Sequence, residues 1–550
     1  MRMHQWIVTV GLAGAVACGG GELGDPAALS PERAPLAQTT AGELEGLWAD
    51  EGAGIAVYRG VPFAAPPVGD LRWTPPAPVE PWEGARAADI FGPACWQTRN
   101  ADDSPYARGE LPRSEDCLTL NVWTPASDGE ALPVMVWYHG GGHTAGVGSA
   151  RLFDGTSLAR RGVLVVTANY RLGPFGFLAH PALTAESGHG SSGNYGLLDH
   201  IAALQWVQDN IAAFGGDPGN VTIFGQSAGS QSVCALHVSP LARGLFHKAI
   251  GHSGGCLGAP RVHLDTTGGV ATGVSAHERG LAMAAELGVE GEGPEAAAAL
   301  RAAPPEAVLE AGGAIGILVD GWVIPRLPSD IFAAGEQNDV DLILGSMSDE
   351  GVTLFAGMPE PPRDEFEAGI RSQYGGQAAA LLAAYGAELD ESTRRAGQAI
   401  NADRTFTWQM RAWAREVAGD ADVYLYFFSH APPVFRLYVP DRPELEEFPG
   451  GARGAGAYHS GDLAYAFHNL DLVGIGWNER DHELSAQISG YWVNFAKTGD
   501  PNGEGLPAWP AYDPVSEPAL GFATEETAVT TKVRETKLDL FDPSYQVSRN

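Results

Sequence analysis

Positive charge is scarce in this chain of 550 residues. Lysine and arginine together number 34 against 67 aspartates and glutamates, so the formal net charge is −33 at pH 7. Lysine occurs only at Lys248, Lys497, Lys532 and Lys537. An acidic chain of this kind does not bind nucleic acid, nor does it dock on an anionic lipid surface through a basic patch. The charge identifies no substrate, and we interpret it as a solvated acidic surface.

Long apolar runs are also missing. The run from Trp6 to Ala17 is shorter than the roughly 20 residues that a transmembrane helix needs. It follows a short segment with Arg2 as its only basic residue and ends at Cys18 before three glycines. Residues 1–17 are therefore predicted to be a signal peptide. The cleavage region resembles a bacterial lipobox, although alanine stands where leucine is usual. We expect a lipid anchor at Cys18 and a flexible tether over residues 18–37, with ordinary secretion as the alternative.

Cysteine is rare, with five residues in total. If Cys18 is lipidated, Cys95, Cys117, Cys234 and Cys256 remain. An even number in an exported protein favours disulfides, and no two of them have the Cys-x-x-Cys spacing of a metal site. We expect Cys95 to pair with Cys117 and Cys234 with Cys256, with buried free thiols as the alternative. The sequence has no ligand cluster for a metal or a cofactor, so none is expected.

What the chain does contain is a large apolar fraction arranged in alternating strand and helix patterns. Hydrophobic residues make up 44% of it, which is enough for a large core. Short β-branched runs predict buried strands, and an amphipathic stretch over residues 195–214 predicts a long helix. This alternation indicates an α/β protein with a mostly parallel sheet and helices on both faces. Residues 277–312 are expected to form an inserted group of helices, and no linker divides the single domain predicted over 38–545. The predicted strands are 134–138, 163–170, 221–224, 248–252 and 342–345.

The pattern Gly-x-Ser-x-Gly occurs twice, around Ser227 and around Ser253. A nucleophilic serine in this motif needs a buried strand before it and a helix directly after it, because the sharp turn exposes the hydroxyl. Ser227 follows "VTIF" and precedes "AGSQSVCALHV", which can form a helix. Ser253 follows a strand, but "GGCLGAP" after it cannot start a helix. We therefore predict that Ser227 is the nucleophile and that Ser253 is a hydrogen-bonding residue near the site.

Several longer motifs give the chain a specific resemblance. They occur in the expected order over some 500 residues, from about Gln38 to near residue 545. Together they resemble the carboxylesterase type-B family, the cholinesterase-like branch of the α/β-hydrolases. The resemblance implies an α/β-hydrolase fold and a serine esterase that forms an acyl-enzyme and acts on a small-molecule ester. The motifs are "SEDCLTLNVWTP" (114–125), "HGGGH" (139–143), "ANYRLGPFGFL" (168–178), "FGGDPGNVTIFGQSAGS" (214–230) and "FAKTGDPN" (495–502).

The resemblance also implies the partners of Ser227. In these hydrolases the acid and then the histidine follow the serine along the chain. Glu350 matches the family position in "LILGSMSDEGVTLF" (342–355), with the adjacent Asp349 as its rival. His459, in "GAYHSGDLAYAF" (456–467), matches the histidine loop. The implied oxyanion hole consists of backbone amides of Gly141, Gly142 and Ala228.

Three departures from the family bear on the substrate. Gln226 precedes the nucleophile where many relatives have glutamate, which weakens the case for a cationic substrate. His143 replaces an aromatic residue after the glycine run, so we expect a more polar pocket mouth. The loop closed by Cys95 and Cys117 matches a lid-like loop but carries Arg99, Asp102, Asp103, Arg108, Glu110 and Arg113. Such a polar loop favours soluble esters over long-chain triglycerides.

Two further matches are expected to be structural. Arg171 with Asp199, and Arg72 with Glu115, stand where relatives have buried ion pairs. The alternatives left open are a lipase, a carbamate or polyester hydrolase of the same family, and a non-catalytic binding or adhesion module on the same fold. Contact with a membrane is expected only through the lipid anchor.

Overall fold

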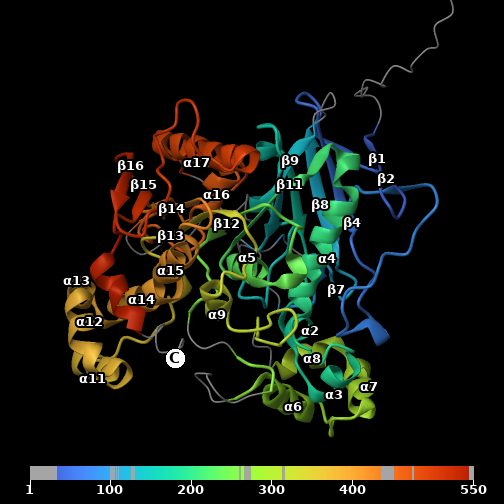
Figure 1. Cartoon of the computed structure of the whole chain (residues 1–550), viewed down its shortest axis with the longest axis horizontal. Coiled ribbons are helices and arrows are strands. Elements are labelled where there is room, and N and C mark those ends of the chain that lie inside the picture. Colours follow the sequence, from blue (N-terminus) through green and yellow to red (C-terminus); the bar gives the residue numbers. More distant parts are fainter. Residues whose placement is uncertain are drawn as a thin grey trace, which may run out of the picture.

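A single large β-sheet organises the molecule (Figure 1). The computed structural model describes residues 34–98, 106, 108, 111–125, 131–258, 262–265, 274–312, 316–434, 451–473 and 476–543. Within these residues the sheet has eleven strands in the order β16-β15-β14-β13-β12-β11-β9-β10-β8-β4-β3. Its strands are β3 (Leu47–Asp50), β4 (Ile55–Pro62), β8 (Thr119–Pro125), β9 (Leu132–Tyr138), β10 (Leu164–Ala168), β11 (Gly216–Gln226), β12 (Lys248–His252), β13 (Asp341–Met347), β14 (Val423–Phe428), β15 (Pro518–Phe522) and β16 (Thr527–Thr531).

Two small sheets and the helices complete the described elements. The small sheets are β1 (Leu36–Gln38), β2 (Glu43–Glu45) and β5 (Ala85–Ala87), and β6 (Ala94–Cys95) with β7 (Arg113–Ser114). The α-helices are α1 (Thr156–Ala159), α2 (Gly173–Phe177), α3 (Pro181–Glu186), α4 (Tyr195–Asn210), α5 (Ala228–Val238), α6 (Ala276–Glu286), α7 (Pro294–Ala302), α8 (Pro305–Ala311), α9 (Pro328–Ala333), α10 (Gly351–Leu354), α11 (Arg363–Tyr374), α12 (Ala378–Ala384), α13 (Gly386–Glu391), α14 (Thr393–Ala402), α15 (Trp408–Val417), α16 (Leu463–Ala466), α17 (Glu479–Thr498) and α18 (Glu535–Leu538). Single turns are η1 (Gly69–Leu71), η2 (Arg151–Phe153), η3 (Ile211–Phe214), η4 (Pro240–Ala242), η5 (Gly375–Gln377), η7 (Leu470–Leu472) and η8 (Asp539–Phe541), and η6 (Asp403–Thr407) is a π-helix.

The middle of the sheet is parallel and its margins are antiparallel. Strands β10, β9, β11, β12, β13, β14 and β15 pair in parallel, whereas β3, β4 and β8 on one side and β16 on the other pair antiparallel. Each run predicted as a buried strand overlaps one of the strands β9 to β13, so the strands are confirmed, although the run predicted over 163–170 extends beyond β10 at both ends. Runs rich in valine, isoleucine and leucine form such strands because both sheet faces are covered.

Helices cover both faces, and alternate residues of one strand reach different cores. In β9, Val134, Val136 and Tyr138 belong to one buried cluster that includes residues of α4, α5 and α15. Met135 and Trp137 point the other way, into a cluster that includes residues of α16 and α17. This alternation follows from the two-residue period of a strand. The predicted α/β-hydrolase architecture is confirmed in this respect.

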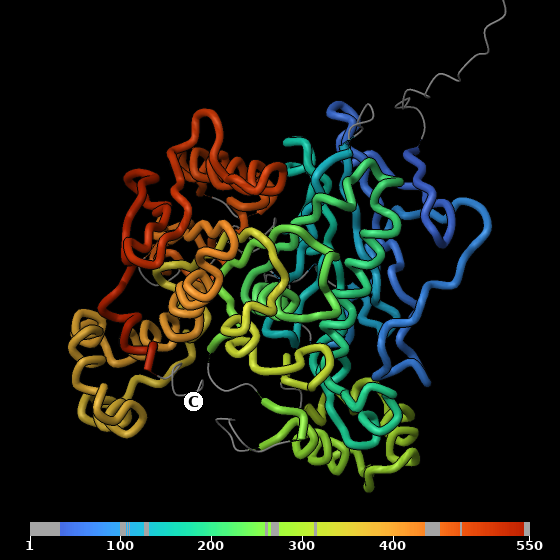
Figure 2. Tube along the Cα trace, in the orientation of Figure 1, coloured from blue at the N-terminus to red at the C-terminus, as the bar shows by residue number. Residues whose placement is uncertain are grey.

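Two groups of helices lie outside the sheet layers (Figure 2). Helices α6, α7 and α8 follow β12 and confirm the insertion predicted over residues 277–312. Helices α11 to α14 lie between β13 and β14 in the chain. At the N-terminal end, β1 already pairs with β2 from Leu36 onward. The predicted signal peptide, Cys18 and most of the tether lie outside the described residues. Among the described helices we find none with the length and apolar content of a membrane span.

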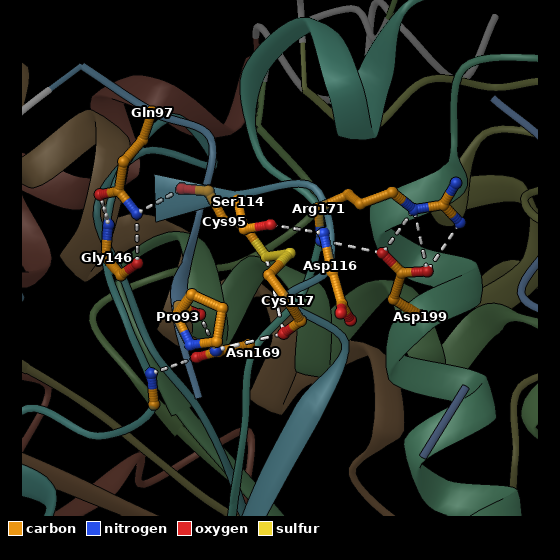
Figure 3. The surroundings of a disulfide bond; sticks show 11 residues. Pro93, Cys95, Gln97, Ser114, Asp116, Cys117, Gly146, Asn169, Arg171 and Asp199 are labelled. Carbon is orange, nitrogen blue, oxygen red and sulfur yellow. Dashed lines mark hydrogen bonds and ion pairs between the residues drawn. A yellow bond between two sulfur atoms is a disulfide. The ribbon is translucent and has the colours of Figure 1, made fainter. Parts of the chain in front are cut away.

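Both predicted disulfides form. Cys95 joins Cys117 and Cys234 joins Cys256, each across a sequence separation of 22 residues. The first lies beside Asn169, whose side chain bonds Cys117 O at 3.2 Å and accepts the Gly148 amide at 2.8 Å (Figure 3). These contacts connect the disulfide to the loop that follows β9.

The two predicted ion pairs are also present. Arg171 contacts Asp199 at 2.7 Å and Arg72 contacts Glu115 at 2.5 Å, and both arginines are buried. Figure 3 shows the first pair beside the Cys95–Cys117 disulfide. Removing one partner of such a pair leaves an uncompensated buried charge, which costs about 3–5 kcal/mol.

Candidate functional site

Ser227 occupies a sharp turn between β11 and α5. The strand ends at Gln226 and the helix begins at Ala228, with Ser227 as its N-cap at φ 56° and ψ −124°. This backbone conformation is strained for a residue with a side chain and is typical of functional turns. Ser227 is half-buried although both neighbours are buried. The turn therefore presents the hydroxyl at the carboxyl end of the sheet, above the N-terminus of a helix.

The glycines of the motif are required by close packing. A Cβ at Gly225 would lie 2.5 Å from the backbone of Gly229, and one at Gly229 would lie 2.0 Å from Tyr138 O. Real Cβ atoms do not approach other atoms this closely, so neither site accepts alanine without movement. The strand and helix backbones meet at the elbow because both positions lack a side chain.

Glu350 and His459 form a hydrogen-bonded pair although 109 residues separate them. His459 Nδ1 lies 2.5 Å from Glu350 Oε2, and Glu350 Oε1 accepts the Met347 amide at 2.8 Å. Both side chains are buried. The rival Asp349 turns away and contacts Arg395 of α14. Adjacent residues at the end of β13 thus point in different directions, and Glu350 is the one that faces the imidazole.

The remaining nitrogen of His459 contacts a residue that the sequence did not assign to the site. Gln226 Nε2 lies 3.1 Å from His459 Nε2. The Tyr106 hydroxyl contacts Gln226 Oε1 and lies 2.6 Å from Ser460 Oγ. Phe406, on the π-helix η6, packs on the imidazole with ring centroids 4.6 Å apart. The sequence distinguishes Gln226 only as a departure from the family, and no sequence signal indicates Tyr106.

The glycine loop after β9 adjoins the elbow, since a Cβ at Gly140 would lie 2.8 Å from Gln226 O. Gly141 has φ 102° and Gly142 has φ 66°, which are conformations that favour glycine. A Cβ at Gly141 would lie 2.1 Å from Ala145 O. Within the described residues, the amides of Gly141, Gly142 and Ala228 donate to no protein acceptor. Unpaired donors in a glycine loop and at a helix N-terminus are suited to hold an anion.

Ser253 lies at the end of the neighbouring strand β12, with φ 51°. Its amide donates to Gly345 O at 2.8 Å, but its hydroxyl is buried and has no hydrogen-bond partner among the described residues. The sequence predicted a hydrogen-bonding role for this side chain, and the described residues do not provide a partner for it. No helix follows Ser253 directly, as the sequence predicted.

Histidines next to the glycine loop are buried. His143 is only 4% exposed and bonds Ser232 of α5 at 3.0 Å, so its side chain turns inward rather than toward a pocket mouth. Burial lowers the pKa of His139 to about 4. Burial also holds the pKa of His200 well below its usual value, with the nearby His143 and His139 adding to the effect. The imidazoles of His139 and His200 are therefore neutral at pH 7.

The parallel sheet, the strained serine turn at its carboxyl end and the histidine–carboxylate pair define an α/β-hydrolase. Comparison with known proteins narrows this class. The sequence model of the family described as "Carboxylesterase family" matches residues 33–541. This chain belongs to the carboxylesterase family and is a carboxylic ester hydrolase.

Similar proteins come from bacteria and mammals. The chain is 35% identical to fumonisin B1 esterase of Sphingopyxis macrogoltabida, with 86% of this chain and 84% of that protein covered. It is 34% identical to para-nitrobenzyl esterase of Bacillus subtilis, with 89% and 95% covered. The crystal structure of a Geobacillus stearothermophilus carboxylesterase superposes with a TM-score of 0.76 at 32% identity, covering 94% of this chain and 100% of that one.

Proposed function

We propose that the esterase acts through a Ser227–His459–Glu350 triad. A neutral serine hydroxyl is a weak nucleophile and needs a base within reach to take its proton. His459 Nε2 accepts that proton as Ser227 Oγ attacks the ester carbonyl, and Glu350 holds Nδ1–H and orients the ring. The imidazolium then protonates the leaving alcohol. A water molecule, activated by the same base, hydrolyses the acyl-enzyme and restores Ser227.

The amides of Gly141, Gly142 and Ala228 are proposed to hold the oxyanion of both tetrahedral intermediates. Each donor of this kind contributes roughly 3–4 kcal/mol to lowering the barrier in comparable sites. The loop with Gly141 and Gly142 is tied to the disulfide region because Gln97 bonds both the amide and the carbonyl of Gly146 at 2.8 Å. This support keeps the donors in place before the substrate arrives, which is what makes them effective.

We propose a small, soluble ester as the substrate. The relatives named for esters of fumonisin B1 and of para-nitrobenzyl groups are consistent with this class. The neutral Gln226 beside the base offers no charge to a cationic substrate. Four of the six charged residues that make the Cys95–Cys117 loop polar lie outside the described residues: Arg99, Asp102, Asp103 and Glu110. The preference against long-chain lipids therefore rests on the sequence of this loop.

The protein is proposed to act outside the cytoplasm. The two disulfides support this, because disulfides persist in oxidising compartments. We propose that residues 1–17 are removed as a signal peptide, that Cys18 carries a lipid anchor followed by a tether over 18–37, and that 38–545 form one catalytic domain. A lipase of the same family is the main alternative activity.

The observation that carries the proposal is the His459–Glu350 hydrogen bond of 2.5 Å at the same end of the sheet as the strained Ser227 turn. In hydrolysis of p-nitrophenyl acetate, Ser227→Ala is expected to lower kcat by about 10⁵-fold or more, as loss of a triad nucleophile does elsewhere. Its thermal unfolding should match that of the parent. Turnover at the parent rate by a folded Ser227→Ala protein would refute the proposal.

A further inference from the structure

The side-chain amide of Gln226 contacts His459 Nε2, the atom that must accept the proton of the nucleophile. Gln226 is 0% exposed and its Nε2 lies 3.1 Å from His459 Nε2. Glu350 already accepts a hydrogen bond from Nδ1–H of the same ring. The neutral imidazole has one N–H, so Nε2 is left with a lone pair and no proton. The Gln226 amide must therefore turn an N–H toward this lone pair.

The opposite end of the amide is also held. The Tyr106 hydroxyl donates to Gln226 Oε1, and Ser460 Oγ lies 2.6 Å from the same hydroxyl. Burial raises the pKa of Tyr106, and the negative charges of Asp462 and Glu350 add to the rise, so the phenol stays protonated and able to donate. An amide whose oxygen is occupied in this way presents its NH₂ group to His459. The donor and acceptor ends of Gln226 are thus fixed by two different partners.

Room for this contact depends on the glycine loop. A Cβ at Gly140 would lie 3.0 Å from Gln226 Oε1 and 3.0 Å from Tyr106 Cε1. Both side chains pack where any other residue at position 140 would project. Tyr106 therefore reaches the site from the Cys95–Cys117 loop because Gly140 leaves the space open.

An amide donor and a carboxylate act in opposite ways on an imidazole. The amide N–H bonds only to an unprotonated Nε2, so it favours the neutral base. A carboxylate at the same place attracts the imidazolium and favours the protonated ring. Among the described residues, Glu350 bonds His459 and Tyr106 bonds Gln226, while Asp349, next to Glu350, is paired with Arg395. Asp462, whose charge acts on Tyr106, is paired with His252 and accepts a hydrogen bond from the Tyr426 hydroxyl.

We propose that Gln226, held by Tyr106, is a positioning residue that favours the neutral form of His459 and so keeps the general base available at acidic pH. This inference rests on the proposed role of His459. When the substrate is attacked, the hydrogen bond from the Gln226 amide to His459 Nε2 breaks, and the same lone pair of Nε2 accepts the proton of the Ser227 hydroxyl. Between turnovers it holds the ring so that Nε2 faces the elbow.

The test is the pH dependence of kcat/KM for p-nitrophenyl acetate, followed at the isosbestic wavelength of the product. In Gln226→Glu, the acid limb is expected to move to higher pH by about one unit or more, as expected for a carboxylate beside an imidazole. Activity at alkaline pH should recover to within about tenfold of the parent, because the triad itself is intact. Gln226→Met, which has similar length but no donor, should move the limb in the same direction and less far.

Tyr106→Phe provides a second, milder variant. It keeps the ring and removes the hydroxyl that fixes the amide, so the acid limb should rise by less than in Gln226→Glu while KM stays unchanged. A purely structural role would lower Tm without moving the profile. Acid limbs of Gln226→Glu and Tyr106→Phe that both coincide with the parent would overturn the inference, and so would a move to lower pH. If Gln226→Glu does not fold, the Tyr106→Phe profile decides.

Labelling with a fluorophosphonate separates this inference from the proposed function. Stoichiometric labelling of Ser227 in the parent, together with superimposed pH profiles, would refute only the role of Gln226. Absence of the label from Ser227 in the active parent would refute the proposed nucleophile itself.

Discussion

Strands β11 and β12 lie side by side, and each is followed directly by a serine with a positive φ, Ser227 at 56° and Ser253 at 51°. The amide of Ser227 donates to His252 O at 2.9 Å, so the two turns are in direct contact. Ser227 is half-buried and stands at the N-terminus of α5, whereas Ser253 is buried with no partner for its hydroxyl among the described residues. The same sequence pattern thus yields one accessible hydroxyl and one enclosed hydroxyl.

Close packing requires the glycines of the second turn. A Cβ at Gly254 would lie 2.3 Å from Ser227 O, and one at Gly251 would lie 2.9 Å from Ser230 Oγ. Ser230 in turn donates to Gly254 O at 2.5 Å. Gly251 and Gly254 thus pack against the first turn and the helix that follows it. Gly255, the second glycine of the pattern, instead packs against Gln409 of α15, since a Cβ there would lie 2.9 Å from Gln409 Cβ. A motif of this kind can therefore mark the neighbour of a nucleophile as well as the nucleophile.

Among the further substitutions, the largest effect should come from the acid that pairs with His459. Glu350→Gln keeps the shape of the side chain but favours the wrong tautomer of His459, so kcat should fall by about 10⁴-fold, as in the comparable triad substitution. The matched control is Asp349→Asn, which removes a contact to Arg395 and should change kcat by less than about tenfold. Steady-state kinetics with p-nitrophenyl acetate measures both. Equal losses in the two variants would contradict the assignment of Glu350.

Gly254→Ala tests the packing role of the second turn. The added methyl would meet Ser227 O, so we expect a loss of about 1–3 kcal/mol in the free energy of unfolding, as overpacking causes elsewhere. kcat should fall as well, because the elbow must shift. Urea denaturation and kinetics report the two effects. Gly357→Ala is the control, since a Cβ at Gly357 meets nothing within 4 Å; a Gly254→Ala protein as stable as this control would contradict the packing account.

Acid should lower the free energy of unfolding through His139, which precedes the glycine loop. Burial lowers the pKa of His139 to about 4, below the value of about 6.5 in an unfolded chain. A lowered folded-state pKa means that the unfolded chain binds the proton first. Stability is therefore complete above pH 6.5 and is lost as the pH falls toward 4, by about 3 kcal/mol for this residue.

The measurement is the free energy of unfolding as a function of pH for the parent and for His139→Gln, which cannot titrate. The variant should lose less stability over the same interval. Identical slopes in the two proteins would show that His139 does not contribute.

Ser253→Ala should have the smallest effect. The substitution removes a buried hydroxyl that has no partner among the described residues, so stability should stay within about 1 kcal/mol of the parent or rise slightly. kcat/KM should stay within about twofold of the parent, because the hydroxyl has no role in the chemistry. Thermal unfolding and kinetics check both values. A tenfold loss of activity would assign Ser253 a function that the geometry does not provide.

Much of this arrangement could be predicted from the sequence because it rests on local patterns. The β-branched runs of β9 to β13 and the helix after Ser227 follow from periodicity and turn chemistry. Strand β11 starts at Gly216 and is longer than predicted. The sequence did not indicate this because Gly-Asp-Pro-Gly is typical of a turn. Gly216 pairs with Leu132, and a register shift separates this pair from the rest of the strand.

The contact between Gln226 and His459 could not be predicted, because tertiary packing brings together residues 233 positions apart. Tyr106 precedes Gln226 by 120 positions and lies on a polar loop, whose composition does not indicate a contact with the site. Gly140 leaves the space that Tyr106 occupies, and although the glycine run is visible in the sequence, it does not show which side chain fills that space. The π-helix that places Phe406 on the imidazole is likewise hidden within an ordinary amphipathic stretch.

The most direct test of the account is covalent labelling with a fluorophosphonate, followed by peptide mapping with mass spectrometry. The parent and Ser253→Ala should each take up one label per chain, on the peptide that contains Ser227, and Ser227→Ala should take up none. Label on the Ser253 peptide, or undiminished labelling of Ser227→Ala, would contradict the claim that the turn at the end of β11 carries the nucleophile.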